Sequence, residues 1–173
     1  MSPTTYEPPI LQHDASGHAG SMQLVSFKLG EETFGIEITR IREIILIGEI
    51  TRVPETPPYV KGLINLRSTV IPVIDLRTRF SLAESELTAD SRIMVLNVGS
   101  RMIGIVVDSV NEVLRVTQEQ LSPSPPTVIS GGNEYMTGLV RLKEDLLILL
   151  DVDRLLGDDE TRALMDAAGR GGA

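Results

Sequence analysis

An internal repeat restricts the fold of this chain more than any other feature of the sequence. Two ungapped alignments define it: residues 24–46 lie over 93–115, and residues 59–80 lie over 135–156. The matched pairs include Gly30 with Gly99, Gly35 with Gly104, Ile36 with Ile105, Glu43 with Glu112, Tyr59 with Tyr135, Gly62 with Gly138, Leu63 with Leu139, Leu66 with Leu142 and Asp75 with Asp151. Two similar half-structures predict a cleft between them, and ligands or partners commonly bind in such clefts.

Each repeat opens with the pattern of a β-hairpin. In residues 23–38, apolar and polar residues alternate on both sides of a turn-rich stretch, which is typical of a half-buried strand pair. In residues 93–107, both arms are almost wholly apolar, which predicts strands buried on both faces. The residues that follow each hairpin have the spacing of a short helical turn or a sharply bent strand.

The later part of each repeat predicts a strand followed by a helix. Pro72 lies within the first of these strands, and because proline removes a ladder donor, we expect this strand at a sheet edge or with a bulge. Ile148 stands at the equivalent position of the second repeat, so that strand is expected to pair normally. Asp75 and Asp151 precede the helix-like stretches and are predicted N-caps, whose carboxylates accept free backbone N–H groups. The second helix is expected over residues 151–166.

Length and composition favour a small β-rich module with an aliphatic core. The chain has 173 residues, enough to bury about 70% of its unfolded surface. Tryptophan and cysteine are absent, which excludes disulfides and thiolate chemistry. The longest apolar run, Leu146–Leu150, is far shorter than the roughly 20 residues of a membrane helix, so no direct membrane insertion is expected. Residues 1–21 and 167–173 are expected to be a disordered leader and tail, without the layout of a signal peptide.

The net charge argues against a nucleic-acid partner. It is −8 at pH 7, and the excess is uneven: residues 1–80 carry 8 basic and 9 acidic side chains, whereas residues 81–173 carry 8 and 15. A nucleic-acid binder needs a clustered basic face with stacking aromatic residues. The sequence has neither pattern.

Residues suited to catalysis or metal binding are scarce. His13 and His18 lie in the expected leader, so no ordered histidine is predicted to act as a general base. Asp151 and Asp153 resemble a pair of metal ligands, but their place at the start of a helix favours capping. The sequence has no glycine-rich phosphate loop and no Gly-x-Ser-x-Gly. We therefore expect no enzyme activity, metal or cofactor.

Six segments match one protein family in order and spacing. They are residues 34–38, 41–44, 59–67, 71–77, 104–108 and 135–139. Together they make residues 24–160 resemble the CheW-like domain family of chemotaxis coupling proteins. The resemblance implies a mostly β fold, with two SH3-like five-stranded β-barrel subdomains related by the internal repeat, short helices and a C-terminal helix. It places the domain at 22–160, the first barrel at about 22–82 and the second at about 90–150, and leaves an exchange of boundary elements open.

The resemblance implies the function of a non-catalytic adaptor. Such proteins connect the cytoplasmic signalling tips of chemoreceptors to the regulatory domain of the histidine kinase CheA, and other copies of the adaptor take part in rings. The chain is then expected in the cytoplasm, peripheral to the inner membrane through receptor arrays. The alternative, from a different class, is a double-barrel module that holds a small molecule in the groove between the barrels.

The resemblance also assigns site residues. The kinase-binding candidates are Ile41, Glu43 and Ile44. The alternative is that both isoleucines belong to the core and that the glutamate is a solvated carboxylate. The receptor-binding candidates, near the junction of the barrels, are Asn65, Arg67, Val110 and Val113. The arginine is the most specific of these, because its planar guanidinium binds carbonyls or a carboxylate in a geometry that lysine does not reproduce.

Two positions carry open alternatives. Ser68 stands where the family has a glycine after Asn-Leu-Arg. A backbone with positive φ costs serine about 1 kcal/mol, so either the loop differs here or the position tolerates an ordinary backbone. The proline-rich loop 122–126 is either a contact for the kinase or neighbouring adaptors, or a rigid surface connector.

Overall fold

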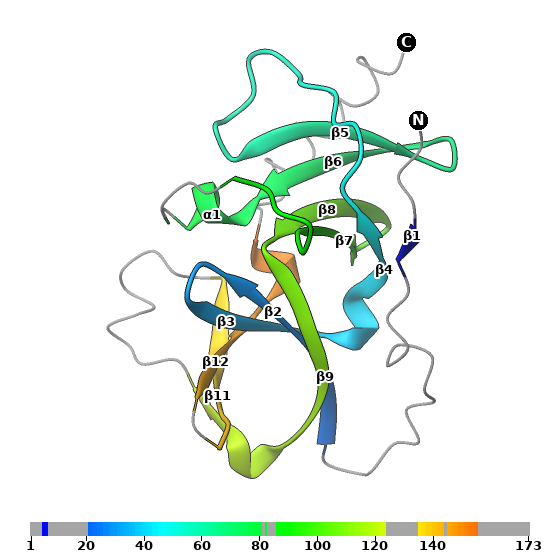
Figure 1. Cartoon of the computed structure of the whole chain (residues 1–173). Helices are drawn as coiled ribbons and strands as arrows, with labels where there is room; N and C mark the ends of the chain where they lie inside the picture. Colours follow the sequence, from blue (N-terminus) through cyan, green and yellow to red (C-terminus); the bar gives the residue numbers. More distant parts are fainter. Residues whose placement is uncertain are drawn as a thin grey trace.

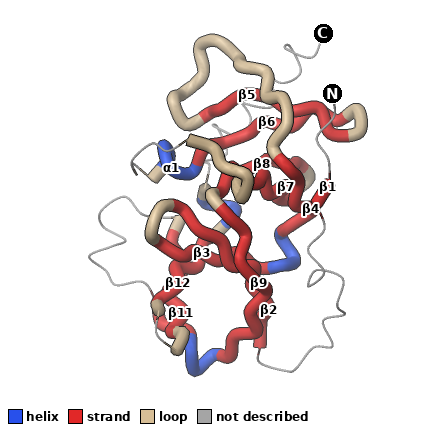
Figure 2. The backbone as a smooth tube through the Cα atoms, viewed as in Figure 1, coloured by secondary structure: helices blue, strands red, loops and turns tan. Residues whose placement is uncertain are grey.

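The computed structural model describes residues 5–6, 21–80, 82, 86–123, 135–143 and 145–155. Its strands are β1 (Thr5–Tyr6), β2 (Ser21–Leu29), β3 (Glu32–Glu37), β4 (Ile41–Leu46), β5 (Val60–Leu66), β6 (Thr69–Asp75), β7 (Arg92–Val98), β8 (Arg101–Val107), β9 (Ser109–Thr117), β10 (Leu121–Pro123), β11 (Met136–Arg141) and β12 (Leu146–Leu150). Its helices are η2 (Ile38–Arg40), α1 (Leu76–Arg79), η3 (Gln118–Gln120) and η4 (Val152–Arg154). Strands dominate the backbone (Figure 2), so the predicted mostly β fold is confirmed.

The strands form two six-stranded sheets, which occupy the upper and lower halves of Figure 1. The order in sheet A is β1-β4-β7-β8-β6-β5, and the order in sheet B is β10-β11-β12-β3-β2-β9. Sheet B curves back on itself, because β9 continues through η3 into β10 at the opposite end of the order. We call each sheet with the apolar side chains inside it barrel A or barrel B.

Neither barrel is formed by one repeat alone. The hairpin β7–β8 of the second repeat lies between β4 and β6 of the first, and the hairpin β2–β3 lies between β9 and β12. Each hairpin joins the other repeat through an antiparallel pairing on one side and a parallel pairing on the other. Residues 22–82 therefore supply strands to both barrels, and the two repeats interlock.

The strand register follows the sequence repeat. Val73 pairs with Gly104 in barrel A, and its repeat equivalent Leu149 pairs with Gly35 in barrel B. Register shifts fall at equivalent places on β5 and β11, and again on β4 and β9. The duplication inferred from the sequence is therefore present in the backbone pairing.

Gly35 and Gly104 leave room for the side chains that pack against them. A Cβ atom at Gly35 would lie 2.7 Å from Cδ2 of Leu147, and one at Gly104 would lie 2.9 Å from Cγ2 of Ile93. In a close-packed interior a side chain at either position would displace its neighbour. The two glycines that the alignment matches thus have the same packing role in both barrels.

Strand β6 differs from the expectation based on its proline. It lies between β5 and β8, so the expected edge position is wrong, and the register shift of the β5–β6 pair lies on β5. Pro72 is opposite Leu63, but the Leu63 N–H and carbonyl bond Thr51 instead, at 2.7 and 2.8 Å. The parallel pairing with β8 begins only at Val73. Proline is tolerated because no neighbouring strand requires the donor that it lacks.

Three apolar clusters fill the molecule. One lies inside barrel A around Ile64 and Val95, and another lies inside barrel B around Val140 and Leu147. The largest cluster is shared, because it takes buried residues from strands of both barrels and from Leu155. Full burial of one such side chain contributes about 1.5–3 kcal/mol. The shared core therefore holds the two barrels together.

Both predicted N-caps are confirmed. The Asp75 carboxylate accepts the Arg77 N–H at 2.9 Å, and the Asp151 carboxylate accepts the Asp153 N–H at 3.0 Å. The turns that they cap are short, since α1 has four residues and η4 has three. The remainder of the helix expected over 151–166 lies outside the described residues.

Most of the expected leader also lies outside the described residues, including His13 and His18. Within it, Thr5–Tyr6 forms β1 and pairs antiparallel with β4. This part of the leader therefore contributes a short strand to sheet A.

Candidate partner-binding surface

The structure brings together two residues that the sequence assigned to different partners. Glu43 on β4 and Arg67 in the β5–β6 turn form a two-pronged ion pair, with Nη1–Oε1 at 2.8 Å and Nη2–Oε2 at 3.1 Å. The Glu43 side chain is 11% exposed and the Arg67 side chain is 68% exposed. Planar guanidinium and carboxylate groups match in this geometry, which strengthens the contact. One predicted kinase-binding residue and one predicted receptor-binding residue are therefore in direct contact.

The turn that carries Arg67 is strained. Leu66 and Thr69 close the β5–β6 hairpin, and both residues between them have positive φ, 51° at Arg67 and 69° at Ser68. Such values are typical of a type I′ turn, which prefers asparagine and glycine. The left-handed backbone costs an ordinary residue about 1–2 kcal/mol. Of the two alternatives for Ser68, an ordinary backbone is therefore wrong, because serine adopts a conformation that suits glycine.

The other candidates near this ion pair differ in exposure. Asn65 is exposed on β5, and Ile41 is half-buried against the shared core. Ile44 belongs to that core and is 1% exposed. It cannot touch a partner without a rearrangement of β4, so its place supports the core alternative for this residue.

Val110 and Val113 are the repeat equivalents of Ile41 and Ile44 and lie on β9 in barrel B. Both are half-buried and pack against the shared core. Val110 pairs with Phe27, and Val113 pairs with Val25, on the neighbouring strand β2. These two candidates are thus in a different sheet from the Glu43–Arg67 ion pair.

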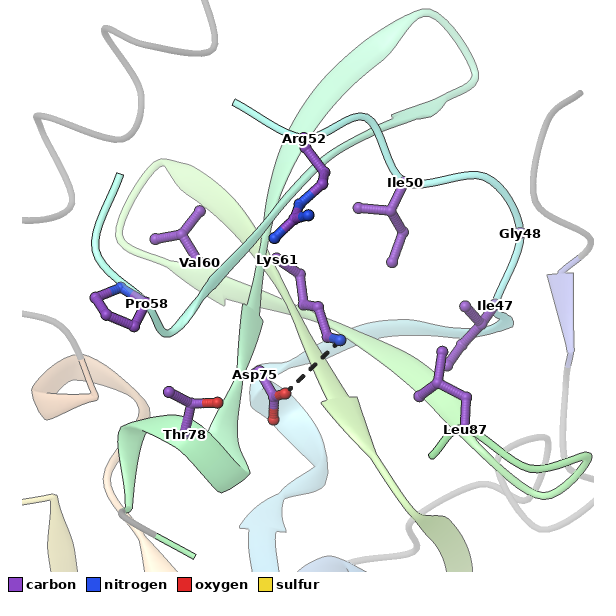
Figure 3. Close-up of a pocket in the computed structure, with 10 residues that line it drawn as sticks. All are labelled: Ile47, Gly48, Ile50, Arg52, Pro58, Val60, Lys61, Asp75, Thr78 and Leu87. Atoms are coloured by element: carbon purple, nitrogen blue, oxygen red, sulfur yellow. Dashed lines mark ion pairs between the residues drawn. The ribbon is translucent and has the colours of Figure 1, made fainter. Parts of the chain in front are cut away.

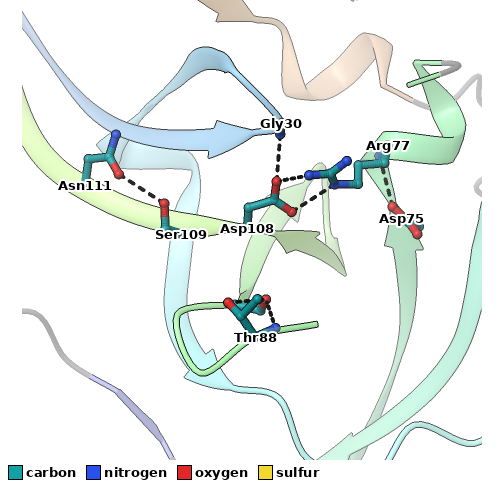
Figure 4. A network of polar contacts seen from close by, with 8 residues as sticks. Gly30, Asp75, Arg77, Thr88, Asp108, Ser109 and Asn111 are labelled. Atoms are coloured by element: carbon teal, nitrogen blue, oxygen red, sulfur yellow. Dashed lines mark hydrogen bonds and ion pairs between the residues drawn. The ribbon is translucent and has the colours of Figure 1, made fainter. Parts of the chain in front are cut away.

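A half-buried ion pair crosses the junction of the barrels (Figure 4). Arg77 of α1 binds Asp108 through two of its nitrogens, with Nε–Oδ1 at 2.9 Å, and the Gly30 N–H donates to the same carboxylate at 2.6 Å. Burial raises the pKa of Asp108, but the hydrogen bonds from Arg77 and Gly30 outweigh it, so this pKa lies below its ordinary value. The side chains of Arg77 and Asp108 are 13% and 32% exposed. The charged form of Asp108 is therefore part of the folded junction.

A second ion pair lies at a nearly equivalent place with the charges exchanged. Arg40 in η2 binds Asp153 in η4, with Nη1–Oδ2 at 3.0 Å, and donates from Nη2 to the Asn97 carbonyl at 3.1 Å. The hydrogen bond from Arg40 lowers the pKa of Asp153. Asp153 matches Arg77 in the repeat alignment, so both junction pairs use the first helical turn after a β-strand.

Sequence reasoning missed both junction ion pairs. In each ion pair the two partners lie far apart in the chain, and the repeat alignment does not match them with each other. The only available signal was the charged residue that follows each N-cap aspartate by two positions, Arg77 and Asp153.

The proline-rich loop 122–126 is only partly described. Of the proline-rich loop 122–126, Ser122 and Pro123 belong to β10 and pair with β11, and residues 124–126 are not described. No group of three or more potential metal ligands occurs among the described residues. None of the helices in the described ranges has the length and apolar character needed to cross a bilayer.

Comparison with known proteins accounts for this arrangement. A family model described as the CheW-like domain matches residues 23–160. The chain belongs to the CheW-like domain family. This CheW-like chain is 40% identical over 151 residues to chemotaxis protein CheW of Klebsiella aerogenes, which covers 87% of the chain and 90% of the relative. It is also 39% identical over 167 residues to chemotaxis protein CheW of Treponema pallidum. That alignment covers 92% of this chain and 98% of the relative.

A solved structure shares the fold of this CheW-like chain. It is the scaffolding protein TtCheW from Thermoanaerobacter tengcongensis, with a TM-score of 0.72 and 30% identity over 80% of this chain and 94% of that chain. The predicted family and the mostly β fold with two sheets are therefore confirmed, but each sheet has six strands rather than the five expected for each barrel. Membership supports a non-catalytic adaptor and does not favour the small-molecule alternative.

Proposed function

We propose that this chain is a non-catalytic adaptor that couples chemoreceptors to the histidine kinase CheA in chemotaxis. The observation that carries the proposal is the CheW-like match over residues 23–160, together with relatives named chemotaxis protein CheW over most of the chain. A relative described as a scaffolding protein supports the same role. In this role the chain acts in the cytoplasm, at the inner membrane through receptor arrays.

We place the kinase contact at Ile41 and Glu43. Both side chains are partly exposed at the start of β4, whereas Ile44 supports them from the core. We place the receptor contact at Asn65 and Arg67, which are exposed, with the half-buried Val110 and Val113 on β9 as further contact positions at the barrel junction.

The Glu43–Arg67 ion pair links the two contacts. Arg67 is the more exposed partner and holds the Glu43 carboxylate with two hydrogen bonds. A receptor carboxylate that binds Arg67 would compete with Glu43 and free this group toward the kinase. Receptor and kinase binding would then be coupled without a conformational change in the barrels, because the Arg67 guanidinium exchanges Glu43 for a receptor carboxylate.

The adaptor is proposed to work in arrays rather than as an isolated pair. A transient interface buries about 800 Å² per partner or less, and separate faces allow receptor, kinase and other copies of the adaptor to bind together. Several weak contacts in one assembly reinforce each other by raising the effective concentration.

The proposal is tested by reconstitution of a receptor cytoplasmic fragment, purified CheA and this chain. We expect the wild-type chain to pull down both proteins and to permit receptor-stimulated phosphorylation. Arg67→Ala is expected to abolish stimulation, and Glu43→Lys is expected to weaken kinase pull-down. The matched control is Lys143→Ala, which changes the repeat equivalent of Arg67.

Thermal unfolding separates a contact role from a structural one. Neither Arg67→Ala nor Glu43→Lys should lower Tm by more than a few degrees, because the pair is exposed on one side. The exchange Glu43→Arg with Arg67→Glu keeps an ion pair but reverses both contacts, so it should restore Tm without restoring stimulation. Normal stimulation by Arg67→Ala would remove this residue from the site.

A further inference from the structure

The connection between β4 and β5 encloses a hollow at one end of barrel A. The hollow has a volume of about 590 Å³ and is lined by this loop, by the start of β5, by the end of β6 with α1, and by Leu87 (Figure 3). Thr51 fastens the loop to β5 through two backbone hydrogen bonds with Leu63, and Pro54, Pro57 and Pro58 stiffen it. The hollow is thus formed in advance, which lowers the ordering cost of binding.

The charged groups of this hollow are unbalanced. Arg52 and Lys61 line it together with one carboxylate, that of Asp75 (Figure 3). One Asp75 oxygen accepts the Arg77 N–H, and the other lies 3.9 Å from Lys61 Nζ, which is too far for a hydrogen bond. Arg52 forms no ion pair with any residue of the described ranges. Both cations can therefore donate to an added anion.

One large apolar side chain is exposed at the same place. Leu46, Leu87 and Leu146 are the large apolar residues exposed in the described chain, and Leu87 lines the hollow with 48% of its surface exposed. Leu87 therefore offers one apolar contact beside the two cations.

The shape favours an extended occupant. A second hollow of about 400 Å³ lies under the same loop and shares four lining residues with the first: Arg52, Pro58, Val60 and Lys61. The two hollows together form a groove with both cations at the junction. One carboxylate lies in each hollow, that of Asp75 in the first and that of Glu55 in the second, so the positive charge is concentrated at the middle of the groove. Such a groove fits a peptide with its acidic group at the middle better than it fits a compact metabolite.

The second repeat shows that the fold does not require this charge. The repeat equivalent of Lys61 is Thr137. The equivalent of Asp75 is Asp151, which pairs with Arg154 at 3.4 Å on its own helical turn. Lys61 is therefore an addition to barrel A rather than a common part of the duplicated framework.

We propose that this groove binds a short acidic segment of a partner protein. Its carboxylates bind Arg52 and Lys61, and an adjacent aliphatic side chain packs against Leu87. The groove lies at the first residues of β5, whereas Arg67 follows the last, about 20 Å along the strand. The contact is thus additional to the kinase and receptor contacts proposed above.

The test uses the full-length chain and two blocked pentapeptides, acetyl-Leu-Glu-Leu-Glu-Leu-amide and its glutamine counterpart. We expect the acidic peptide to shift amide resonances of residues 47–61 and to bind at least tenfold more tightly than the neutral one, less so at high salt. Arg52→Glu should weaken this binding at least tenfold. Arg101→Glu, an exposed change on β8, should leave it unchanged.

A second variant keeps the test independent of folding. Lys61→Thr introduces the residue of the second repeat, so the fold should persist while acidic-peptide binding falls several-fold. Equal binding of both peptides, no binding of either, or full binding by Arg52→Glu would overturn the proposal. A gain in binding after deletion of 156–173 would assign the groove to the acidic residues 158–160 of the same chain, and would overturn a partner protein as the occupant.

Discussion

Barrels A and B share a framework but differ in surface chemistry. Their parallel pairings have the same register and place a glycine at the same position. In barrel A, Glu43 binds Arg67, whereas the equivalent residues in barrel B, Glu112 and Lys143, form no ion pair with each other in the described chain. The common features are those that the duplicated fold needs. The features present in one barrel alone are therefore the better candidates for binding.

The largest expected effect breaks the framework of barrel A. Gly62 has φ +147°, and a Cβ there would lie 2.1 Å from the Thr51 carbonyl oxygen. Because the obstructing atom is backbone, Gly62→Ala must detach the loop from β5, at a cost of about 3 kcal/mol. Gly99→Ala is the control, since Gly99 also has positive φ but no heavy atom within 4 Å, and should cost about 1 kcal/mol. Urea unfolding measures both, and equal losses would contradict the proposed backbone clash.

The two junction ion pairs allow a second comparison. Asp108→Asn removes the charge from the more buried pair and should lower the free energy of unfolding by about 2 kcal/mol. Asp153→Asn acts on a carboxylate that is 58% exposed and should cost less than about 1 kcal/mol. Chemical denaturation at pH 7 gives both values. A larger loss of unfolding free energy for Asp153→Asn than for Asp108→Asn would show that solvent exposure does not determine how much each ion pair stabilises the fold.

The same carboxylate predicts a dependence on pH. The folded pKa of Asp108 lies below its ordinary value, so its contribution to stability is complete above the unfolded pKa of about 4 and is lost as the pH falls through the folded pKa. The Tm difference between the wild type and Asp108→Asn should therefore narrow from pH 7 toward pH 3. A difference that stays constant over this range would show that the charge of Asp108 does not stabilise the junction.

A smaller effect is expected at the strained turn of barrel A. Ser68 has φ 69°, which glycine adopts without steric cost, so Ser68→Gly should stabilise the chain by about 0.5–1 kcal/mol. The matching change in Tm is about 1–4 °C. Ser100→Gly, in the exposed turn between β7 and β8, serves as the control, because Ser100 has no positive φ. Destabilisation by Ser68→Gly would indicate that the serine side chain supports the turn.

The smallest effect tests whether barrel B can acquire the surface of barrel A. Lys143→Arg places a guanidinium at the repeat equivalent of Arg67. The second repeat already has Glu112 as the equivalent of Glu43. Because both residues are exposed, the stability should change by less than about 0.5 kcal/mol. Kinase stimulation should also stay unchanged, and a marked gain would show that the ion pair alone defines the contact.

The sequence predicted the duplicated framework in detail but not its connectivity. Alignment of Gly35 with Gly104 reproduces the register of both parallel strand pairs, because close packing at these positions excludes a side chain. It did not show which hairpin completes which barrel. Hydrophobic periodicity specifies the buried face of a strand, whereas the neighbouring strand is chosen by contacts far away in the sequence. For the same reason Pro72 was expected at an edge, since the hydrogen bonds of Leu63 with Thr51 are not visible in a local pattern.

The candidate site was predicted in its members but not in its arrangement. Glu43 and Arg67 came from the family resemblance, and the exposure of Arg67 is consistent with binding, whereas the Glu43 side chain is only 11% exposed. Their ion pair was not foreseen, because a charge pattern predicts partners only along one helix or across one known strand pair. Ile44 came from the same resemblance but belongs to the core. An apolar residue in a matching motif can have either a binding or a core role, and only its burial in the structure separates the two.

The interlocked hairpins have a consequence during synthesis. The hairpin β2–β3 leaves the ribosome early, but its neighbours β9 and β12 belong to the second half of the chain and are translated much later. Until then its apolar strands and unpaired edges are exposed to aggregation. Pairing between strands so far apart in the sequence also slows folding. A chain truncated before β9 leaves this hairpin without a sheet, so a fragment of the gene that ends between the repeats should yield an insoluble product rather than a working half.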